Sequence, residues 1–280
     1  MTANSGGGFV RANGIDIYYV QAGQGAPVVL LHGGVVSTNP VWAHAPISYA
    51  AHMQDLARRY RIIAPDTRGC GRTVHDGSVV TFGQLADDVV ALADALDLDQ
   101  PLIAGFSEGG ITATVAAIRS PDRFRGIVND AGYDAFNPQA PTAAMMRQML
   151  GGSPDATQAD PAAFAQMMAQ DPQMSAIFEL FKADQDGGQG EGHWEQYLRL
   201  AFRRLTEFPG YTFQDLAKIT APALILVGDR DDYCTLEEGI AAYRQLPRGE
   251  IAVVPDTGHV ITPAKIELTL AFFDRHLQAA

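Results

Sequence analysis

The chain has 280 residues, of which 47% are hydrophobic and 19% are charged, and its formal net charge is −12. This composition is ordinary for a soluble globular protein and is enough for one large core or two domains. The excess of acidic residues would repel a polyanion, so nucleic acid is not an expected partner. No apolar stretch reaches the roughly 18–20 residues of a membrane-spanning helix, so no membrane partner is expected either.

The first residues indicate where in the cell the protein is located, and the cysteines indicate that it has no metal site. Met1 to Gly8 are polar and rich in glycine, without the charged and then apolar pattern of a signal peptide, so we expect a disordered start and a cytoplasmic protein. Cys70 and Cys234 are not spaced like metal ligands and do not indicate a disulfide framework. We expect no metal, and we interpret Cys234 as a buried structural thiol, with a locally reactive thiol as the alternative.

Short apolar runs alternate with amphipathic stretches along most of the chain. The clearest predicted helix covers residues 81–96, where Leu85, Val89 and Leu92 fall on one stripe. The other predicted helices cover residues 45–60, 111–120 and 263–276. The predicted strands cover residues 15–20, 27–31, 61–64, 101–105, 124–129, 223–227 and 251–254. Such alternation predicts an α/β protein with a parallel sheet that is covered by helices on both faces.

One segment breaks this alternation. Between about residues 134 and 216 no strand is predicted, and helical pieces rich in Met and aromatic residues are separated by Pro and Gly. A loop of that length without structure would be unusual in a compact protein. We therefore predict a core domain made of residues 1–133 and 217–280 and a helical cap domain over 134–216, whose loosest parts are 151–154 and 186–190.

The strongest functional motif is Gly105-Phe106-Ser107-Glu108-Gly109, which lies between a predicted strand and a predicted helix. A serine at the apex of such a turn has a strained backbone and presents its hydroxyl outside the fold. Glycines on either side avoid collisions with the neighbouring strand and helix. In this context the motif indicates that Ser107 is a nucleophile; the alternative is a strand-to-helix turn that contains a serine by chance.

A serine hydroxyl needs a base to take its proton, an acid to orient that base, and donors for the oxyanion. Of the seven histidines, His259 is the best base, because it lies on a loop that leaves the last predicted strand at the carboxyl edge of the sheet. Asp231 is the best acid, because it follows the predicted strand 223–227 and gives the chain order Ser, Asp, His. Asp130 leaves the same edge of the sheet and stays a competitor.

Two backbone N–H groups are expected to bind the oxyanion. One belongs to Glu108, which directly follows the nucleophile at the start of a helix, where the dipole favours negative charge. The other is expected from Gly34 in the His32-Gly33-Gly34 loop, because glycines let that loop approach the serine closely; a plain turn after a strand is the alternative. For the Glu108 side chain, helix capping is the favoured interpretation, and tuning of the charge at the site is the alternative.

With these motifs in order, the chain resembles the α/β-hydrolase superfamily over nearly its whole length. The motifs are the His32-Gly33-Gly34 loop, the segment 66–71, the Ser107 turn, the segment 228–231 and Gly258-His259. The resemblance is greatest to the capped branch with epoxide hydrolases, haloperoxidase-like esterases, lactonases and C–C bond hydrolases. It implies an eight-stranded, mostly parallel sheet whose second strand is antiparallel, a helical cap inserted after strand six, and a triad of Ser107, Asp231 and His259.

Departures from the family's patterns narrow the expected activity. Epoxide hydrolases and haloalkane dehalogenases have aspartate where this chain has Ser107, and the His-Gly-Gly loop lacks the Pro-Gly of proline iminopeptidases. We expect a cofactor-independent serine hydrolase that cleaves a carboxylic ester or a lactone through an acyl-enzyme. The enzymatic alternative is C–C bond cleavage of a vinylogous diketone by the same triad. The non-hydrolytic alternative is a ligand receptor or a cofactor-free oxygenase.

The predicted cap determines the expected substrate. Met and aromatic side chains suit an adaptable apolar wall over the active site. We therefore expect a small-molecule substrate that is uncharged, largely apolar and enclosed rather than bound at the surface. Residues expected to contact it are His32, Gly33, Trp42, Phe106 and Trp194.

Overall fold

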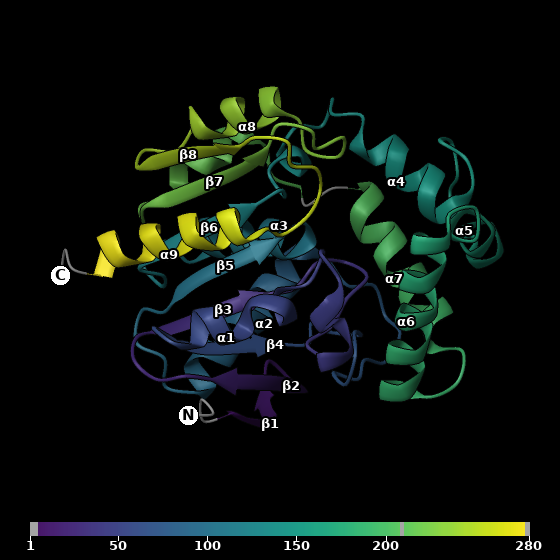
Figure 1. The fold of residues 1–280 in the computed structure, drawn as a ribbon, viewed down its shortest axis with the longest axis horizontal. Helices are drawn as coiled ribbons and strands as arrows, with labels where there is room; N and C mark the ends of the chain where they lie inside the picture. The colour runs from purple at the N-terminus through teal and green to yellow at the C-terminus, as the bar shows by residue number, and fades with distance from the viewer. Residues whose placement is uncertain (1–4, 208–209, 278–280) are drawn as a thin grey trace.

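The computed structural model describes residues 5–207 and 210–277 of the chain. This part contains an eight-stranded sheet with the order β1-β2-β4-β3-β5-β6-β7-β8 (Figure 1). β2 is antiparallel to β1 and β4, and the other neighbouring strands are parallel, which confirms the predicted sheet. The strands are β1 Ser5–Ala12, β2 Ile15–Ala22, β3 Pro27–Leu31, β4 Arg61–Pro65, β5 Leu102–Phe106, β6 Gly126–Asp130, β7 Ala223–Gly228 and β8 Gly249–Val254.

The central strands form the core because they are covered on both faces. Every residue of β5, β6 and β7 is buried, as expected for parallel strands between two helical layers. α9 (Pro263–Leu277) crosses one face over β6, β7 and β8, and α3 (Glu108–Arg119) contacts β3, β5 and β6 on the other (Figure 1). The layers also contain α1 Met53–Ala57, α2 Phe82–Ala95 and α8 Leu236–Tyr243. Within residues 5–207 and 210–277, none of the helices has the length and hydrophobicity to cross a bilayer.

Residues 45–60 do not form the single helix that the sequence predicts. This region contains one short 3-10 helix, η2 Tyr49–His52, followed by α1, and a further 3-10 helix, η1 Pro40–His44, ends just before it. Pro46 has no N–H to donate to a continuing helix. The Ser48 hydroxyl accepts from the N–H of Ala50 at 3.1 Å and so caps the N-terminus of a separate helix, η2.

The expected disordered start is wrong from Ser5 onward. Ser5–Ala12 forms β1, which pairs with β2 along its full length. A side chain at Gly7 would collide with the carbonyl oxygen of Tyr19 on β2, so Gly7 allows this edge strand to pair closely. The rest of the predicted disordered segment, residues 1–4, lies outside the described residues.

A helical insertion lies between β6 and β7, as the resemblance implies. Its helices stack beyond one end of the sheet (Figure 1). They share a second hydrophobic cluster that includes Phe164, Phe181 and Tyr197 and, from outside the insertion, Trp42. The division of the chain into two domains at residues 134 and 216 stays a prediction. The helices of the insertion are α4 Thr142–Gly151, α5 Pro161–Met168, α6 Pro172–Gln189 and α7 His193–Glu207.

Residues 186–189, which belong to a segment predicted to be one of the loosest parts of the cap, lie inside α6. A side chain at Gly188 would collide with the backbone of Gly71. The side-chain oxygen of Gln185 accepts from the N–H of Gly71 at 3.1 Å. Gly188 therefore lets α6 pack tightly on the loop after β4.

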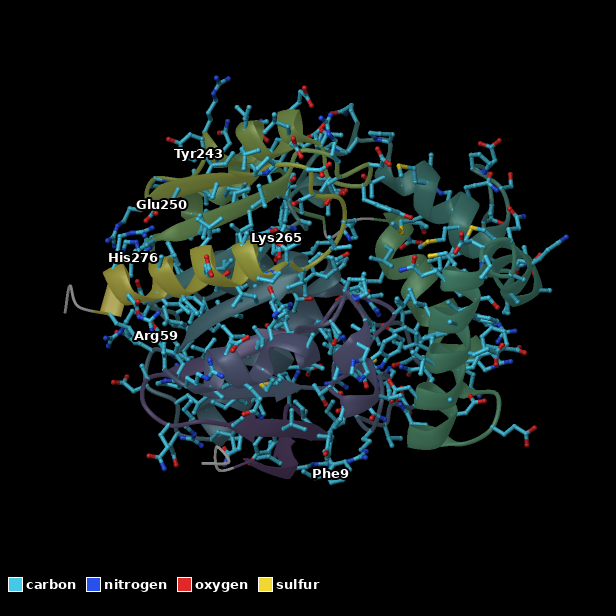
Figure 2. The ribbon with its side chains drawn as sticks, in the orientation of Figure 1. Phe9, Arg59, Tyr243, Glu250, Lys265 and His276 are labelled. Carbon is cyan, nitrogen blue, oxygen red and sulfur yellow. The ribbon has the colours of Figure 1, made fainter. Side chains whose placement is uncertain are left out.

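A buried ion pair joins the end of β6 to the start of α9. Lys265 Nζ lies 2.6 Å from Asp130 Oδ1, and both side chains are 1% exposed. Lys265 lies where α9 crosses the sheet (Figure 2). Burial raises the pKa of Asp130 to about 6, and the Lys265 ammonium opposes this shift. Removal of one partner would leave the other in the core without a counter-ion.

Lys265→Met should therefore lower the free energy of unfolding by about 3–5 kcal/mol, because it leaves the Asp130 carboxyl unpaired. The double variant Asp130→Asn/Lys265→Met removes both charges and should regain most of this loss. Urea unfolding followed by circular dichroism measures both changes. A Lys265→Met protein as stable as the parent would contradict a buried, interacting pair.

Candidate active site

Ser107 lies at the turn between β5 and α3, at the carboxyl edge of the sheet. Its φ of 53° and ψ of −119° are an unusual conformation for a residue with a side chain. The Ser107 N–H donates to the Asp130 carbonyl oxygen at 2.7 Å, which fixes the turn against β6. Side chains at Gly105 and Gly109 would collide with α3 and with the end of β3, so the close approach of these elements requires both glycines.

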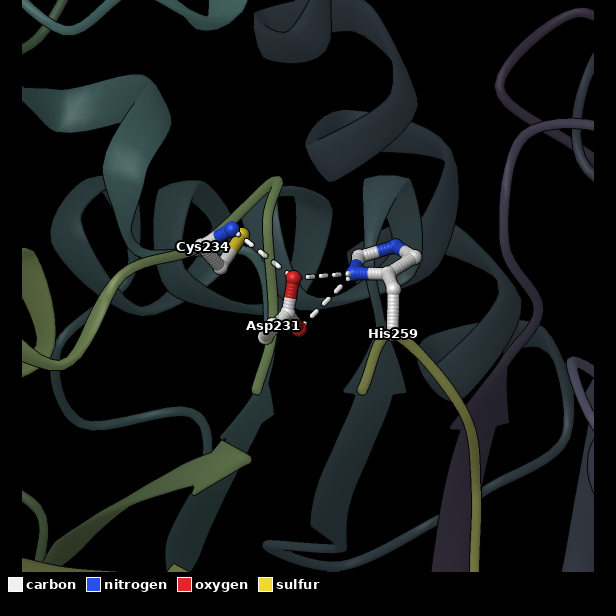
Figure 3. A group of neighbouring side chains, drawn as sticks. All are labelled: Asp231, Cys234 and His259. Carbon is white, nitrogen blue, oxygen red and sulfur yellow. Dashed lines mark hydrogen bonds and ion pairs between the residues drawn. The ribbon is translucent and has the colours of Figure 1, made fainter. Parts of the chain in front are cut away.

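His259 and Asp231 form a hydrogen-bonded pair at the same edge of the sheet (Figure 3). His259 Nδ1 lies 2.9 Å and 3.1 Å from the two carboxylate oxygens of Asp231. Asp231 Oδ1 also accepts from the backbone N–H groups of Tyr233 and Cys234, both at 2.9 Å. Burial opposes ionisation, but these hydrogen bonds lower the pKa of Asp231 below its ordinary value. The charged carboxylate favours the His259 tautomer with its proton on Nδ1, which leaves Nε2 free to accept a proton.

Two aromatic rings hold the His259 imidazole in place. The ring centroids of Phe106 and Tyr233 lie 4.8 Å and 4.9 Å from that of His259. The His259 side chain is 19% exposed, whereas that of Asp231 is fully buried. Phe106 therefore contacts the imidazole and helps to orient it, and its expected contact with substrate stays a prediction.

The two candidate acids have different partners. Asp231 bonds His259, whereas Asp130 bonds Lys265. Strand order explains the difference, because β7 pairs directly with β8 and their following loops are neighbours, while β6 is one strand further away. The geometry thus brings Asp231, and not the Asp130 side chain, into hydrogen-bonding contact with His259.

Ser107 and His259 line one cavity of about 30 Å³, which has room for about two water molecules. Met146 of α4 and Leu205 of α7 are part of its wall, so the insertion lies directly over Ser107. A substrate of more than a few atoms must displace these side chains, and a methionine adapts readily. The other residues of the wall are Phe82, Ile111, Ala131, Asp134, Ala135, Thr142, Tyr233 and Cys234.

Asp134 is a polar residue of this wall that sequence reasoning did not identify. Its Oδ1 lies 2.8 Å from the Cys234 thiol, while Oδ2 is buried and has no hydrogen-bond partner among the residues that the structure describes. Burial raises the pKa of Asp134. The neighbouring Thr142 hydroxyl donates to the Tyr233 carbonyl oxygen at 3.2 Å, and when it turns toward Asp134 instead it lowers the pKa of that carboxyl. The only feature of the sequence that could have indicated Asp134 as a site residue is its position just beyond the predicted strand that became β6.

The His32-Gly33-Gly34 loop lies beside Ser107, as expected. A Cβ atom placed on Gly33 would lie 3.7 Å from the Ser107 Cβ atom. His32 is buried, its Nδ1 donates to the Gly33 carbonyl oxygen at 2.7 Å, and its Nε2 accepts from the Thr67 N–H at 3.1 Å. His32 therefore fixes the shape of the loop, and its expected contact with substrate stays a prediction.

The Glu108 side chain does not cap α3 but bonds the insertion. Its Oε1 accepts from Arg204 of α7 at 2.7 Å, and the two side chains are 4% and 1% exposed. The same helix reaches the glycine loop, because the Tyr197 hydroxyl donates to the Gly34 carbonyl oxygen. α7 is thus bonded to both residues whose N–H groups are expected to bind an oxyanion.

The two tryptophans belong to the packing of the insertion. Trp42 is fully buried, and its Nε1 donates to Asp184 of α6 at 2.7 Å. Trp194 packs edge to face on Phe178 with 5.4 Å between ring centroids. Their expected contact with substrate stays a prediction, because neither contributes to the wall of the cavity at Ser107 as it stands.

Both cysteines are buried and free, which confirms Cys234 as a buried thiol. Cys234, Asp231 and His259 have potential metal-ligand atoms within 4.8 Å of one another (Figure 3). A metal requires the thiolate, but burial raises the pKa of the Cys234 thiol well above its ordinary value. Its Sγ lies 2.8 Å from Asp134 Oδ1 and 3.0 Å from the Ala131 carbonyl oxygen, and these two acceptors share its single proton. These groups therefore suit a hydrogen-bonded acid and base better than a metal site.

Comparison with known sequences assigns this arrangement to a family. The model described as "Alpha/beta hydrolase family" matches residues 28–265. 3-Oxoadipate enol-lactonase 2 of Acinetobacter baylyi is 27% identical over 232 residues, which cover 82% of this chain and 81% of that protein. 2-Hydroxy-6-oxo-2,4-heptadienoate hydrolase of Pseudomonas putida is 36% identical over 127 residues, but these cover only 44% of this chain and 43% of that protein.

Solved structures have the same fold. The enol-lactonase from Burkholderia xenovorans LB400 superposes with a TM-score of 0.67 at 19% identity, over 96% of this chain and 99% of that one. A meta-cleavage product hydrolase from Pseudomonas fluorescens IP01 superposes with a TM-score of 0.71 at 20% identity, over 96% and 97% of the two chains. At these identities the likeness concerns the fold alone. Because the family model extends from β3 to α9, the chain belongs to the alpha/beta hydrolase family.

Proposed function

We propose that this protein is a serine hydrolase that cleaves a carboxylic ester or a lactone of a small, largely apolar substrate through an acyl-enzyme on Ser107. One observation carries the proposal: a single cavity contains both the strained Ser107 and His259, and His259 is hydrogen-bonded to the buried Asp231. The three residues then act as nucleophile, base and acid. Membership of a hydrolase family supports the reaction class.

In this mechanism, His259 Nε2 removes the hydroxyl proton while Ser107 Oγ attacks the substrate carbonyl. Asp231 holds the proton on Nδ1 and stabilises the imidazolium that forms. The N–H groups of Gly34 and Glu108 bind the oxyanion, the latter at the N-terminus of α3, where the helix dipole favours negative charge. His259 then protonates the leaving group and activates the water that hydrolyses the acyl-enzyme. We assign no cofactor to these steps.

The wall of the cavity supports a small substrate with one polar group. Phe82, Ile111, Met146 and Leu205 present apolar surface beside Ser107. Asp134 presents a buried carboxyl oxygen that lacks a partner among the described residues, which is costly unless a ligand satisfies it. An ester or lactone with one hydroxyl or amide N–H near the carbonyl would meet both requirements.

Cleavage of a C–C bond by the same residues is the second candidate. It is favoured by the similarity to a protein named 2-hydroxy-6-oxo-2,4-heptadienoate hydrolase. A panel of esters, lactones and vinylogous diketones separates the two candidates. The first predicts the highest kcat/KM on an ester or a lactone, and the second predicts it on a diketone.

A fluorophosphonate probe should label Ser107 and no other serine, because only an activated hydroxyl attacks it. Ser107→Ala should fold normally, lose labelling, and lose activity by several orders of magnitude. Ser120→Ala, just beyond the other end of α3, is the matched control and should keep both. Mass spectrometry of the labelled peptide identifies the site, and labelling of a different serine would refute the assignment.

Asp231→Asn should lower kcat by about 10³–10⁴-fold, because His259 loses the group that holds its tautomer. Asp130 cannot be tested by a single substitution, because its replacement alone would leave the Lys265 ammonium without a counter-ion. The double variant Asp130→Asn/Lys265→Met removes that pair and should keep far more activity than Asp231→Asn. The opposite ranking, in variants shown to be folded by circular dichroism, would assign the acid to the end of β6.

Substrate length should depend on Met146. The parent enzyme should prefer short acyl chains and hydrolyse triglyceride emulsions poorly, because its cavity is small and covered by the insertion. Met146→Ala should move the optimum of kcat/KM in a p-nitrophenyl ester series to longer chains. Met174→Ala, at a side chain that is 40% exposed on α6, is the control and should not. An identical length profile in all three proteins would show that this wall does not select the substrate.

A further inference from the structure

An acidic side chain directly follows the proposed nucleophile and is buried there. Glu108 is 3% exposed. A Cβ atom added to Gly34 would lie 2.9 Å from Glu108 Oε2, so the carboxylate rests on the glycine loop. The two N–H groups assigned to the oxyanion belong to these same residues. An uncompensated negative charge at this place would oppose the oxyanion that forms during acyl transfer.

Arg204 supplies the compensating charge. Its Nη2 lies 2.7 Å from Glu108 Oε1, and its side chain is 1% exposed. Burial acts to lower the pKa of Arg204, but the Glu108 carboxylate together with Tyr197 and Cys70 outweighs it, so the pKa is raised. Arg204 Nε, Arg204 Nη1 and Glu108 Oε2 have no hydrogen-bond partner among the described residues. A buried ion pair that leaves three polar atoms without hydrogen bonds contributes little to the stability of the fold, so stability alone does not explain it.

α7 reaches both halves of the proposed oxyanion site. Tyr197 is fully buried, and its hydroxyl donates to the Gly34 carbonyl oxygen. Tyr197 and Arg204 lie two helical turns apart on one face of α7. Because α7 belongs to the insertion and Glu108 to the sheet-bearing part of the chain, the charge beside Ser107 is balanced only while α7 is seated there.

We propose that Arg204 is a positioning residue for acyl transfer: it neutralises and orients the Glu108 carboxylate, while Tyr197 holds Gly34, so that both backbone N–H groups can bind the oxyanion. This inference rests on the proposed function. It makes the seating of α7 a condition for a fast chemical step. The effect falls on kcat, because the oxyanion forms in the transition state and not in the bound substrate.

Two single variants break the same ion pair but leave opposite charges behind. Arg204→Met leaves the Glu108 carboxylate alone, and kcat should fall about 10–100-fold with little change in KM. Glu108→Gln leaves a positive charge, which favours the oxyanion, so its loss of kcat should be at least about tenfold smaller. Arg204→Lys keeps the charge and should retain more activity than Arg204→Met. The double variant Glu108→Gln/Arg204→Met should recover most of the kcat that Arg204→Met loses.

A purely structural pair gives a different pattern. Both single variants would then lose stability and kcat alike, and equal losses of kcat in folded proteins would overturn the proposal. Tyr197→Phe extends the test should Arg204→Met fail to fold: it removes one hydroxyl, and kcat should fall several-fold at constant KM. A KM effect without a kcat effect would also overturn the proposal.

The parent enzyme separates failure of this inference from failure of the proposed function. A parent protein without ester or lactone turnover would refute the proposed function, and this inference with it. A parent protein with full turnover, together with equal losses in Arg204→Met and Glu108→Gln, would refute this inference alone. The affinity for a boronic acid, which forms an anionic tetrahedral adduct with an active-site serine, should fall across the variants in the same order as kcat.

Discussion

Ser107 lies where the backbones of β3, β5, β6 and α3 come into close contact, and this contact determines most of what surrounds the residue. The Ser107 N–H bonds the end of β6, and side chains at Gly105, Gly109 or Gly132 would collide with the elements packed around the turn. This packing holds Ser107 at positive φ, a strain of about 1–3 kcal/mol that only a rigid surrounding core maintains. It also sets where α3 begins, and therefore where the Glu108 N–H and the helix dipole point.

Buried negative charges around the cavity are mostly compensated by basic side chains. Three buried carboxylates near Ser107 each have a basic partner, and each partner comes from a different part of the chain. Asp231 pairs with His259, Asp130 with Lys265, and Glu108 with Arg204. Asp134 is a buried carboxyl at the same cavity for which the described residues include no such partner. That contrast is why its free oxygen is assigned to the substrate in the proposed function, while the other three carboxylates orient the protein's own groups.

Local patterns in the sequence predicted seven of the eight strands and the Ser107 turn, because apolar runs and Gly-x-Ser-x-Gly act over a few residues, but they missed the glycine-rich β1. The predicted strand 223–227 became Ala223–Gly228, and the predicted helix 263–276 became Pro263–Leu277. The same patterns placed Ser107, Asp231 and His259 at one edge of the sheet, and the roles of these residues stay predictions.

Side-chain partners distant in sequence could not be predicted. The Glu108 carboxylate was assigned to its own helix, but its partner Arg204 lies 96 residues away. Glycines were misinterpreted for a related reason. Gly7 and Gly188 were taken as signs of flexibility, and each instead permits a close backbone contact, with Tyr19 and Gly71 respectively. A glycine indicates freedom or tight packing equally well, and only the tertiary partner decides between them.

The account depends most on a covalent bond between the substrate's acyl group and Ser107. Rapid acid quenching of the enzyme during turnover of a p-nitrophenyl ester, followed by peptide mass spectrometry, tests this directly. The account predicts that the peptide containing Ser107 gains the mass of the acyl group within the first turnover, and that Ser107→Ala shows no such gain. Full turnover without an adduct on that peptide, or with the acyl group on another residue, would contradict it.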